Sequence, residues 1–430
     1  MSTSREIALN ALVRVDDGAY SNLLLPAMLR ESALDDRDRA FTTDLVYGTL
    51  REQRALDYFL AQLSDRALEA LDTPVRAALR LGAYQLMHGV PAHAAVRETV
   101  EVAPERARGY VNAVLRTLAR LGPPWPWPDG DEVEALAVRL SYPDWIVERL
   151  VADLGVEDAR ATMAVGNEPA AVALRVNPEM ATPEAVAREL RSGGVDVARG
   201  ALVDDALLVR GTGDPARLGP VAEGRATPQD EASQAVVAIL DPQPGETVFD
   251  VAAAPGGKAT DIGERVGEDG RVLAVDIQPG RIRLVAAAAR RLGLQSVLRV
   301  VADGRALPAP PASADRVLVD APCSGLGVLR RRPEARWRIG PDQVAPLAEL
   351  QRELLRAAAE VVRPGGVVVY SVCTLTHEET SGVDWAAREL PGLEAEPPPG
   401  PPWRPRGRGA LLLPHDAHTD GMFVLRLRRT

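Results

Sequence analysis

From residue 225 onward, short apolar runs alternate with stretches of helical spacing, and this alternation constrains the fold more than any other feature of the chain. The apolar runs are 246–251, 271–276, 297–302, 316–320, 366–372 and 422–428, and the helical stretches between them are 257–266, 279–293, 343–362 and 378–389. Apolar strands separated by helices are typical of a parallel sheet covered on both faces. We therefore predict an α/β domain with a mostly parallel sheet over residues 225–430, whose last strand enters antiparallel after a Pro-rich loop.

The N-terminal residues follow another pattern, in which apolar side chains recur every three or four positions. This spacing is typical of amphipathic helices, and the breakers between them are few and short. We predict an all-α bundle over residues 1–125, ending in the Pro- and Trp-rich stretch 122–132. Residues 126–224 are predicted to form a linker and a small α/β segment. The elements expected there are helices near 145–154 and 183–192 and the strands ALRVNP and ALLVR.

Composition narrows the class of protein. No apolar run reaches the roughly 18–20 residues that span a bilayer, and the N-terminus lacks the basic and apolar regions of a secretory signal, so we expect a cytoplasmic protein with no membrane contact. Two cysteines and five scattered histidines make neither a disulfide framework nor metal-ligand spacing, so we expect reduced thiols and no metal. The net charge of −10 does not exclude nucleic acid, because nearly all of the acidic excess lies in residues 121–224.

The sequence FDVAAAPGGKATDIGE, residues 249–264, runs from an apolar strand through a loop of small residues into a helix. Small residues let a ligand approach the backbone closely, and the first N–H groups of the helix are free to bind an anion such as a carboxylate. The loop has neither the GxGxxG nor the GxxxxGK[ST] fingerprint, so the dinucleotide and nucleoside triphosphate interpretations lack support. A plain strand-to-helix turn is the alternative that this loop alone leaves open.

Aspartates follow three strands of the predicted sheet, namely Asp276, Asp303 and Asp320. Asp276 follows the small-residue loop by about 20 residues, a distance that suits binding of a ribose diol, and Arg281 comes soon after it. A single strand-end aspartate is usually a cap or a turn residue. Three of them favour a cofactor cleft at the carboxyl edge of the sheet, where open α/β sheets bind ligands.

Both cysteines also follow apolar strands, Cys323 in DAPCSG and Cys373 in YSVCTL. In the predicted sheet they emerge at the same edge, and two thiols beside carboxylates suit covalent addition to an electron-poor ring. A buried inert cysteine, a disulfide and a metal pair are the alternatives. Cytosolic disulfides are rare, and two ligands make a poor metal site.

A cluster of arginines follows Cys323. It consists of Arg330, Arg331, Arg332, Arg336 and Arg338. These side chains are candidates for tracking a phosphate backbone, and Trp337 among them is a candidate for stacking on a base. A solvated charged face is the alternative.

On these residues the chain resembles the RNA cytosine-5 methyltransferases of the Sun type. The segments that carry the resemblance are QDEASQ, PGETVFDVAAAPGGKATDIGE, DAPCSGLGVLRRRPEARWR, PGGVVVYSVCTLTHEE and LLLPHDAHTDGMFVLRLR. The N-terminal segments AFTTDLVYGTLR, LRLGAYQLM, VPAHAAVRETVEVA and YVNAVLR resemble the NusB-like helical RNA-binding domain of the bacterial small-subunit rRNA members. Together with the second strand-end cysteine, they make the chain similar to the bacterial 16S rRNA subgroup.

The resemblance implies a Rossmann-like class I methyltransferase domain that uses S-adenosylmethionine. The residues it assigns to the methionine part of the cofactor are Ala252, Ala253, Ala254, Pro255, Gly256, Gly257 and Lys258. It assigns Asp276 to the ribose hydroxyls, with Arg281 beside it, and Asp303 to the adenine. The chain departs from the family at Ala252, Ala259 and Thr380, where family members usually carry Cys, Thr and Asn.

For catalysis, the resemblance places Asp320 between cofactor and target base, makes Cys373 the nucleophile and gives Cys323 a part in product release. Addition of a thiolate at C6 makes C5 of cytosine nucleophilic enough to take a methyl group. Asp320 is expected to hydrogen-bond the N3 edge of the base and to donate a proton there. The expected substrate is a cytosine in small-subunit ribosomal RNA before assembly is complete, unstacked so that the enzyme reaches it. No obligate protein partner is expected.

Three other interpretations remain open at this point. In the first, Cys323 is the nucleophile, as the Pro-Cys thiol is in DNA cytosine-5 methyltransferases. In the second, the chain binds RNA without catalysis, and retention of both cysteines and of Lys258, the only lysine, argues against it. In the third, the chain is a Rossmann oxidoreductase, which NAD binding would reveal.

Overall fold

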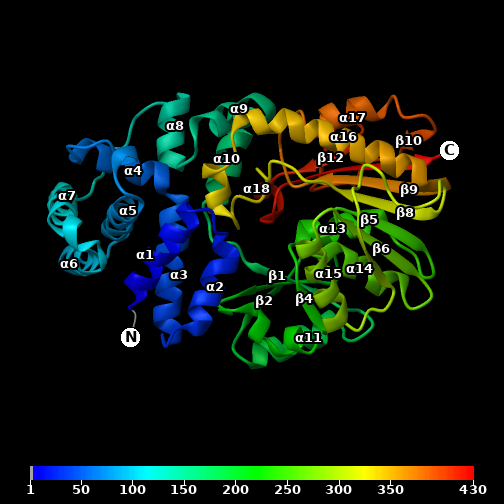
Figure 1. Cartoon of the computed structure of the whole chain (residues 1–430), viewed down its shortest axis with the longest axis horizontal. Coiled ribbons are helices and arrows are strands. Elements are labelled where there is room, and N and C mark those ends of the chain that lie inside the picture. Colours follow the sequence, from blue (N-terminus) through cyan, green and yellow to red (C-terminus); the bar gives the residue numbers. More distant parts are fainter. Residues whose placement is uncertain (1–2) are drawn as a thin grey trace. The chain divides into compact units, whose positions relative to one another are not determined.

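The computed structural model describes residues 3–430 and divides into two compact units (Figure 1). The first unit comprises the chain up to Glu168 together with Leu329–Ile339. The second unit comprises Pro169–Val328 and Gly340–Thr430. Within the described residues, no helix combines the length and the apolar character needed to cross a membrane.

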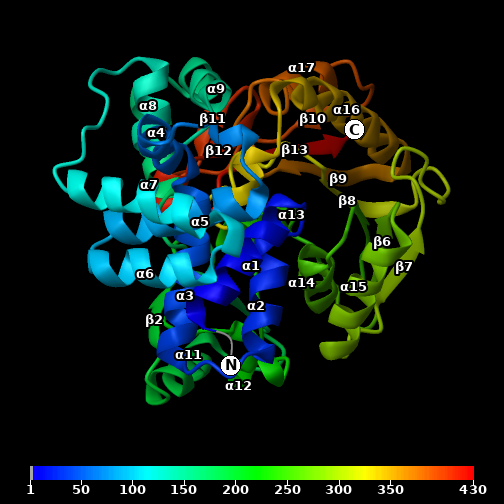
Figure 2. The same ribbon diagram turned by 60° about the vertical axis from the view of Figure 1, so that its left-hand side comes forward.

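The first unit is all-helical, and its helices up to Leu121 confirm the all-α prediction for residues 1–125. Its helices between 133 and 166 lie in the segment predicted as a linker and small α/β segment. Its α-helices are α1 (Ser4–Asp16), α2 (Ser21–Glu31), α3 (Asp36–Arg51), α4 (Gln53–Leu63), α5 (Thr73–Met87), α6 (Ala92–Val102), α7 (Arg108–Leu121), α8 (Val133–Leu140), α9 (Asp144–Leu154) and α10 (Val156–Gly166), and its 3₁₀ turns are η1 (Leu68–Ala70), η2 (Glu105–Ala107) and η4 (Pro333–Trp337). Thr3 and Asp35 cap α1 and α3 by accepting backbone N–H groups. Figure 2 shows α5, α6 and α7 side by side, and their apolar faces join those of α1 and α3 in one core.

The predicted linker at 122–132 contains neither helix nor strand, but it is fixed to the helical core. The rings of Trp125 and Trp127 lie 5.9 and 4.9 Å from the ring of Phe59 in α4, measured between centroids. Aromatic pairs at such distances stabilise beyond the area that they bury. The linker therefore packs as part of the first unit.

Arg336 of η4 is completely buried in the first unit. Its guanidinium carbon lies 3.9 Å from the ring centroid of Tyr142, and its N–H groups donate to the Ser141 carbonyl at 3.0 Å and to Asn167 Oδ1 at 2.8 Å. A cation this deep is tolerated because acceptors and an aromatic face replace its hydration. The expectation that Arg336 tracks a phosphate backbone is therefore wrong, and its role is to hold the 329–339 segment in place.

The second unit begins with a small antiparallel sheet, which confirms the predicted α/β segment. Its strands, in the order β2-β3-β1-β4, are β1 (Val172–Val176), β2 (Asp196–Arg199), β3 (Ala206–Arg210) and β4 (Ala226–Pro228). Helix α11 (Pro183–Ser192) covers this sheet with Val186, Ala187 and Leu190. The short helices η3 (Pro215–Arg217) and α12 (Gly219–Ala222) precede β4.

The large sheet of the second unit has the order β11-β12-β13-β9-β8-β5-β6-β7, with β10 paired to β13. Its strands are β5 (Thr247–Val251), β6 (Arg271–Asp276), β7 (Val297–Val301), β8 (Ala314–Asp320), β9 (Val362–Val372), β10 (Leu393–Ala395), β11 (Arg404–Arg406), β12 (Gly409–Leu412) and β13 (Met422–Arg429). The run from β9 to β7 is parallel, and β13 enters antiparallel beside β9. Both features were predicted from the sequence and are confirmed.

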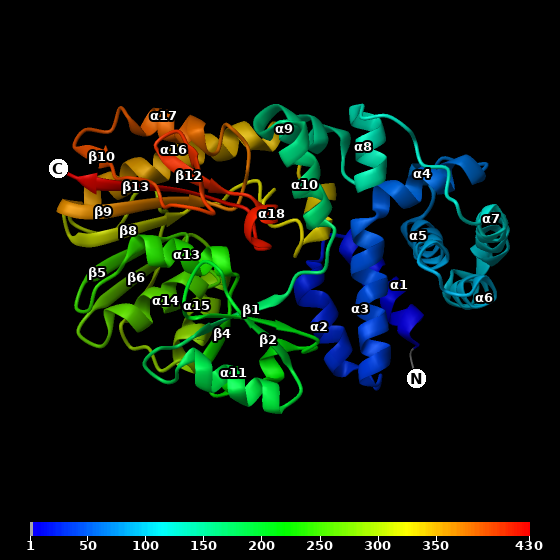
Figure 3. The ribbon, with the colours of Figure 1, turned by 180° about the vertical axis from the view of Figure 1, so that it is seen from behind.

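Helices cover both faces of the large sheet (Figures 1 and 3). The helices on one face are α13 (Glu231–Leu240), α14 (Gly257–Val266) and α15 (Pro279–Arg291). The helices on the other face are α16 (Val344–Val361) and α17 (Ser381–Ala387). The short helix η5 (Pro341–Gln343) precedes α16. The short helix α18 (Pro414–Ala417) precedes β13. Because both faces are covered, the central strands are apolar on both sides, which explains the near-continuous apolar runs.

Arg175 links the small sheet to the helix that follows the small-residue loop. It projects from β1, is 2% exposed, and donates to both oxygens of Glu264 in α14, at 3.0 and 2.8 Å. It also donates to the carbonyl of Gly257 at 2.9 Å and lies 3.8 Å from Asp261. This buried cation therefore compensates two buried carboxylates and holds the first turn of α14.

We expect Arg175→Leu to destabilise the protein by about 3 kcal/mol, because it leaves Glu264 buried without its cation, whereas Asp261 keeps its ion pair with Arg265. Protonation of Glu264, whose pKa burial already raises, relieves part of the cost. The matched control is Arg199→Leu, which removes the exposed pair with Glu184 and should cost less than about 1 kcal/mol. Urea unfolding measures both, and equal costs would contradict the anchoring role of Arg175.

Candidate functional site

The carboxyl ends of four parallel strands meet at one edge of the large sheet. Val251 at the end of β5 pairs with Val275 in β6 and with Val319 in β8, and Asp320 pairs with Ser371 in β9. With this register, the residues that follow each strand leave the sheet at the same level. The loop after β5, the aspartates after β6 and β8 and both thiols are thereby brought to one place.

The loop between β5 and α14 has a backbone that favours small residues. Ala252 has φ +67° and Gly256 has φ +111°, both in the left-handed region. A Cβ at Gly256 would lie 3.0 Å from Cα of Val285, closer than normal packing allows. The loop is also fixed to the sheet, because Ala253 N–H donates to the Val275 carbonyl at 2.8 Å. A ligand can therefore approach both the loop backbone and the first N–H groups of α14.

Asp276 offers a buried acceptor beside this loop. The residue is 3% exposed, and its Oδ1 accepts from Gln278 N–H at 2.9 Å. Its Oδ2 has no hydrogen-bond partner among the described residues, although Arg281 lies 3.9 Å away. Arg281 donates to the Ala254 carbonyl at 2.7 Å and thereby ties α15 to the loop. An orphaned buried oxygen needs a donor, and ribose hydroxyls provide one, so the residues fit the nucleoside cofactor implied by the resemblance.

Asp303, the third predicted cofactor residue, lies beyond the end of β7 and is engaged locally. Both of its oxygens lie 3.0 Å from Nε of Arg305, and Nη2 of the same side chain is 2.7 Å from Oδ2. These hydrogen bonds from Arg305 lower the pKa of Asp303. Contact between Asp303 and an adenine therefore requires Arg305 to share or to release the carboxylate.

Asp320 and Lys258 form an ion pair at the centre of the edge. Lys258 Nζ lies 2.8 Å from Oδ2 of Asp320 and 3.4 Å from Ser233 Oγ, and Ser371 donates to Oδ1 of Asp320 at 2.9 Å. Burial by itself lowers the pKa of Lys258, but attraction by Asp320 and the hydrogen bond to it outweigh burial and raise that pKa. The pair therefore holds an ammonium beside a carboxylate that remains partly exposed to ligand.

Asp250 is a site residue that the sequence analysis missed. It lies in β5, is 1% exposed, and neither carboxyl oxygen has a hydrogen-bond partner among the described residues. Burial raises its pKa well above the ordinary value, and repulsion from Asp320 adds to the effect while Lys258 opposes it. One feature of the sequence could have indicated this residue, namely a charged side chain inside the apolar run TVFDV. A strand that is buried on both faces makes a charge there costly in free energy.

The two thiols lie 3.3 Å apart, Sγ to Sγ, and neither is in a disulfide. A hydrogen bond with Cys373 raises the pKa of Cys323 well above its ordinary value, and burial adds to this. The raised pKa favours the protonated form of Cys323, and either sulfur can be the donor in the contact between them. Within residues 3–430, no group of three His, Cys, Asp or Glu side chains is arranged to hold a metal ion.

Glu379 ties the two thiol-bearing loops together, a role that its position in the sequence does not reveal. The carboxylate is fully buried, and its Oε1 accepts from Ser324 N–H at 2.8 Å and from Gln351 Nε2 at 3.0 Å. Its Oε2 accepts from the hydroxyls of Ser324 at 2.5 Å, Thr374 at 3.1 Å and Thr376 at 2.8 Å. Ser324 follows Cys323 and Thr374 follows Cys373, so one buried anion fixes both thiols.

The three departures from the family pattern fit without disturbing this arrangement. Thr380 is buried and donates to the Thr376 carbonyl at 2.6 Å, so it turns away from the Glu379 carboxylate. Ala259 is buried in the core under α14. Ala252 adopts the left-handed conformation of the loop.

Comparison with protein families matches three successive parts of the chain. Residues 2–120 match the NusB family, residues 142–214 match the ferredoxin-like domain of RsmF/B-like methyltransferases, and residues 237–428 match the 16S rRNA methyltransferase RsmB/F family.

Relatives extend over nearly the full length. The ribosomal RNA small subunit methyltransferase B of Thermus thermophilus is 38% identical, over 99% of this chain and 98% of that protein. The protein of the same name from Pseudomonas syringae is 35% identical, over 98% and 96%. Among solved structures, PH0851 superposes with a TM-score of 0.86 at 27% identity, covering 100% of this chain and 99% of that one. NSun6 from Pyrococcus horikoshii with SFG gives a TM-score of 0.60 at 24% identity, covering 67% and 98%.

Asp250 should make stability depend on pH. Because its pKa is higher in the folded protein than in the unfolded chain, folding becomes less favourable as pH rises from about 4 through the folded pKa. Asn cannot ionise, so Asp250→Asn should gain at least about 1 kcal/mol relative to wild type between pH 4 and pH 8. Urea unfolding at a series of pH values measures the difference, and a pH-independent difference would show that Asp250 is not held protonated.

Loss of the Glu379 carboxylate should expose Cys323. Glu379→Leu removes both anchors of Ser324, whereas Glu379→Gln retains an acceptor for its N–H group. One lost hydrogen bond of about 1 kcal/mol corresponds to roughly fivefold more opening, so Cys323 should react with iodoacetamide at least about five times faster in the Leu variant. Peptide mapping by mass spectrometry measures the rate, with the Gln variant as matched control. Equal rates in wild type and both variants would rule out the anchoring role.

Proposed function

Because the chain belongs to the RsmB/F family of 16S rRNA methyltransferases, we propose that it methylates C5 of a cytosine in small-subunit ribosomal RNA through a covalent bond from Cys373 to C6. Membership of the family makes the protein an S-adenosylmethionine-dependent methyltransferase. The observation that carries the finer proposal is the placement of two free thiols 3.3 Å apart at the carboxyl ends of adjacent strands.

S-adenosylmethionine supplies an electrophilic methyl group. The residues that hold it in this proposal are Ala252, Ala253, Ala254, Pro255, Gly256, Gly257, Lys258, Asp276, Arg281, Asp303 and Asp320. The N–H groups at the start of α14 bind its carboxylate, and the free Oδ2 of Asp276 accepts from its ribose. Arg281 keeps the loop in position through the Ala254 carbonyl.

Cys373 acts first, as the nucleophile. Its thiolate forms a bond to C6, and the electrons of the C5=C6 double bond move into the ring toward N3. Asp320 faces that edge of the base, and the charge that develops at N3 is met by a proton held between Asp320 and Lys258. C5 is then nucleophilic enough to take the methyl group, and the electrons of the broken S–CH₃ bond would stay on the cofactor sulfur, which would leave as S-adenosylhomocysteine.

Cys323 acts in release. A base removes the C5 proton, the C5=C6 double bond forms again, the C6–S bond breaks and N3 returns its proton to the Asp320–Lys258 pair. Cys373 leaves as a thiolate. Cys323, protonated and 3.3 Å away, stabilises this thiolate through a charge-assisted hydrogen bond.

RNA is the substrate of the named relatives, and we extend this to the present chain. The target cytosine must be unstacked to reach a nucleophile at the sheet edge, which is easier in RNA that is not yet fully assembled with protein. The division into a helical RNA-binding domain at 1–125, a linker and small α/β domain at 126–224 and a methyltransferase domain at 225–430 forms part of the same proposal.

The proposal is tested with wild type, Cys323→Ala and Cys373→Ala. Each is incubated with S-adenosylmethionine and an unmethylated small-subunit rRNA transcript, and protein–RNA adducts are separated on a denaturing gel. Cys323→Ala should accumulate an adduct, because loss of a hydrogen bond to a charged thiolate slows release roughly tenfold to a hundredfold. Cys373→Ala should form no adduct and transfer no methyl group.

The reverse pattern would assign the nucleophile to Cys323. Methyl transfer by wild type to RNA without adduct in either variant would refute the covalent route. No methyl transfer to RNA by wild type, with cofactor binding intact, would refute the substrate. Mapping of the methylated base distinguishes C5 of cytosine from any other position.

A further inference from the structure

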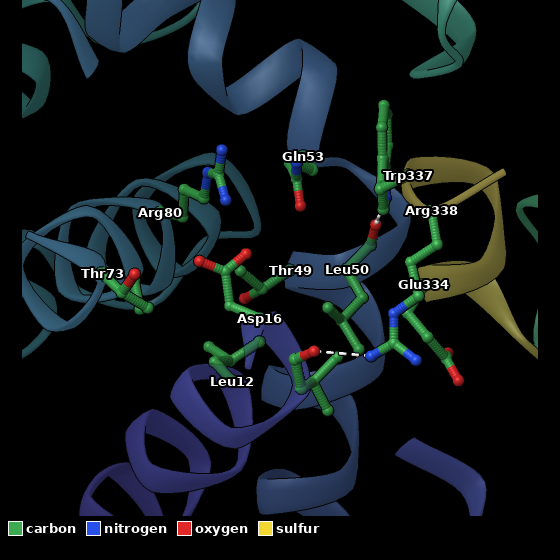
Figure 4. A pocket seen from close by; sticks show the side chains of 12 residues that line it. Leu12, Asp16, Thr49, Leu50, Gln53, Thr73, Arg80, Glu334, Trp337 and Arg338 are labelled. Carbon is green, nitrogen blue, oxygen red and sulfur yellow. Dashed lines mark hydrogen bonds between the residues drawn. The ribbon is translucent and has the colours of Figure 1, made fainter. Parts of the chain in front are cut away.

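The first unit contains a pocket that the proposed chemistry does not use (Figure 4). It lies between α1, α3, α4, α5 and η4, has a volume of about 110 Å³, and is partly open to solvent. Its lining residues are Leu12, Val15, Asp16, Thr49, Leu50, Gln53, Thr73, Ala77, Arg80, Glu334, Trp337 and Arg338.

Part of the pocket lining is apolar and buried. Leu12, Val15, Leu50 and Ala77 are buried residues of the surrounding helices. Trp337 is fixed in orientation, because its Nε1–H donates to the Leu50 carbonyl at 2.8 Å (Figure 4). A fixed indole beside aliphatic side chains makes a surface against which a flat aromatic ring packs.

Polar groups with unused hydrogen-bonding capacity also line the pocket. Thr49 is 2% exposed, and its hydroxyl has no partner among the described residues. Asp16 uses Oδ2 for its ion pair with Arg76, at 2.6 Å, which leaves Oδ1 as an acceptor. Arg80 uses Nε and Nη2 for Asp57, both at 2.7 Å, which leaves Nη1 as a donor. A buried hydroxyl without a partner costs free energy unless a ligand satisfies it.

From these features we propose that the pocket binds one unstacked nucleobase of the RNA substrate, a base that carries an exocyclic amino group. A closed cavity of about 150 Å³ holds a whole benzene ring. This pocket of about 110 Å³ is smaller but partly open, so a six-membered ring enters with one edge while the rest of the ring stays outside. Asp16 accepts from the amino group, Thr49 bonds a ring nitrogen or carbonyl, and Trp337 contacts the ring face. This inference rests on RNA being the substrate.

The chemistry of the lining favours a base over a phosphate. Of the two arginines in the lining, Arg80 is already paired with Asp57, and Arg338 donates to backbone carbonyls of residues 15, 18 and 19. The carboxylate of Asp16 repels an anion but accepts well from an amino group. RNA proteins commonly recognise single-stranded bases in this way, by stacking and by hydrogen bonds to base edges.

The experiment measures equilibrium binding of the full-length protein to the unmethylated small-subunit rRNA transcript at several salt concentrations. The test variants are Thr49→Val, which removes only the hydroxyl, and Ala77→Leu, which fills the pocket. The matched control is Thr43→Val on the same helix, whose hydroxyl donates to the Arg39 carbonyl and does not line the pocket. Thermal unfolding and S-adenosylmethionine binding establish that each variant is folded.

Thr49→Val should weaken RNA binding about fivefold and Ala77→Leu at least about tenfold, from the loss of one hydrogen bond and of base stacking respectively. The slope of log Kd against log salt concentration should stay unchanged, because no phosphate contact is removed. Thr43→Val should bind like wild type.

Wild-type affinity in both folded test variants would overturn the inference, and so would a reduced salt slope, which indicates phosphate contacts instead. Either result leaves the proposed function untouched, since methyl transfer to RNA by wild type is measured separately. If wild type binds and methylates no RNA, the proposed function fails, and the pocket proposal fails with it.

Discussion

The parallel register of β5, β6, β8 and β9 is the constraint on which the site depends. Hydrogen bonds between these strands set Val251 level with Val275 and Val319, and Asp320 level with Ser371. A shift by one residue in any strand would turn a buried side chain toward the opposite face. Because each strand is covered by helices on both sides, such a shift is strongly disfavoured. The register of the strands is therefore sufficient to place the aspartates and thiols at one edge of the sheet.

Buried ions then adjust the geometry that the sheet provides. Glu379 fixes both thiol loops through five donors, and Arg175 fixes the first turn of α14 through carboxylates and a carbonyl. Each ion is costly to bury and is retained because its partners replace its hydration. Lys258 and Asp320 also compensate each other's charge, but both remain partly exposed, so they are available to a ligand.

The sequence predicted the features that depend on local pattern. Strand–helix alternation gave the parallel sheet, three- and four-residue spacing gave the helical unit, and strand-end position gave the common edge of the aspartates and cysteines. It did not predict the roles of Asp250, Glu379 or Arg175, because these depend on partners distant in the chain. Strands β10, β11 and β12 are too short for an apolar period to emerge.

Arg336 is a residue whose role was predicted wrongly, because its partners are also distant in the chain. An arginine cluster in a loop suggests a solvated basic surface, whereas tertiary packing places this one in the interior against Tyr142. The functional roles of the site residues remain predictions, although the structure brings most of them together.

The return of the 329–339 segment to the first unit has a consequence for how the protein can be divided. The chain passes between the units three times, after Glu168, Val328 and Ile339, so no single cut separates them. A fragment that ends at residue 168 lacks Arg336, and the carbonyl of Ser141 and the amide of Asn167 lose the guanidinium that satisfies them. In such a fragment, the buried site that Arg336 fills in the intact protein would be empty and lined by unsatisfied polar groups. The first unit therefore needs residues 329–339 to complete its core, and the two units are not consecutive domains that one cut could separate.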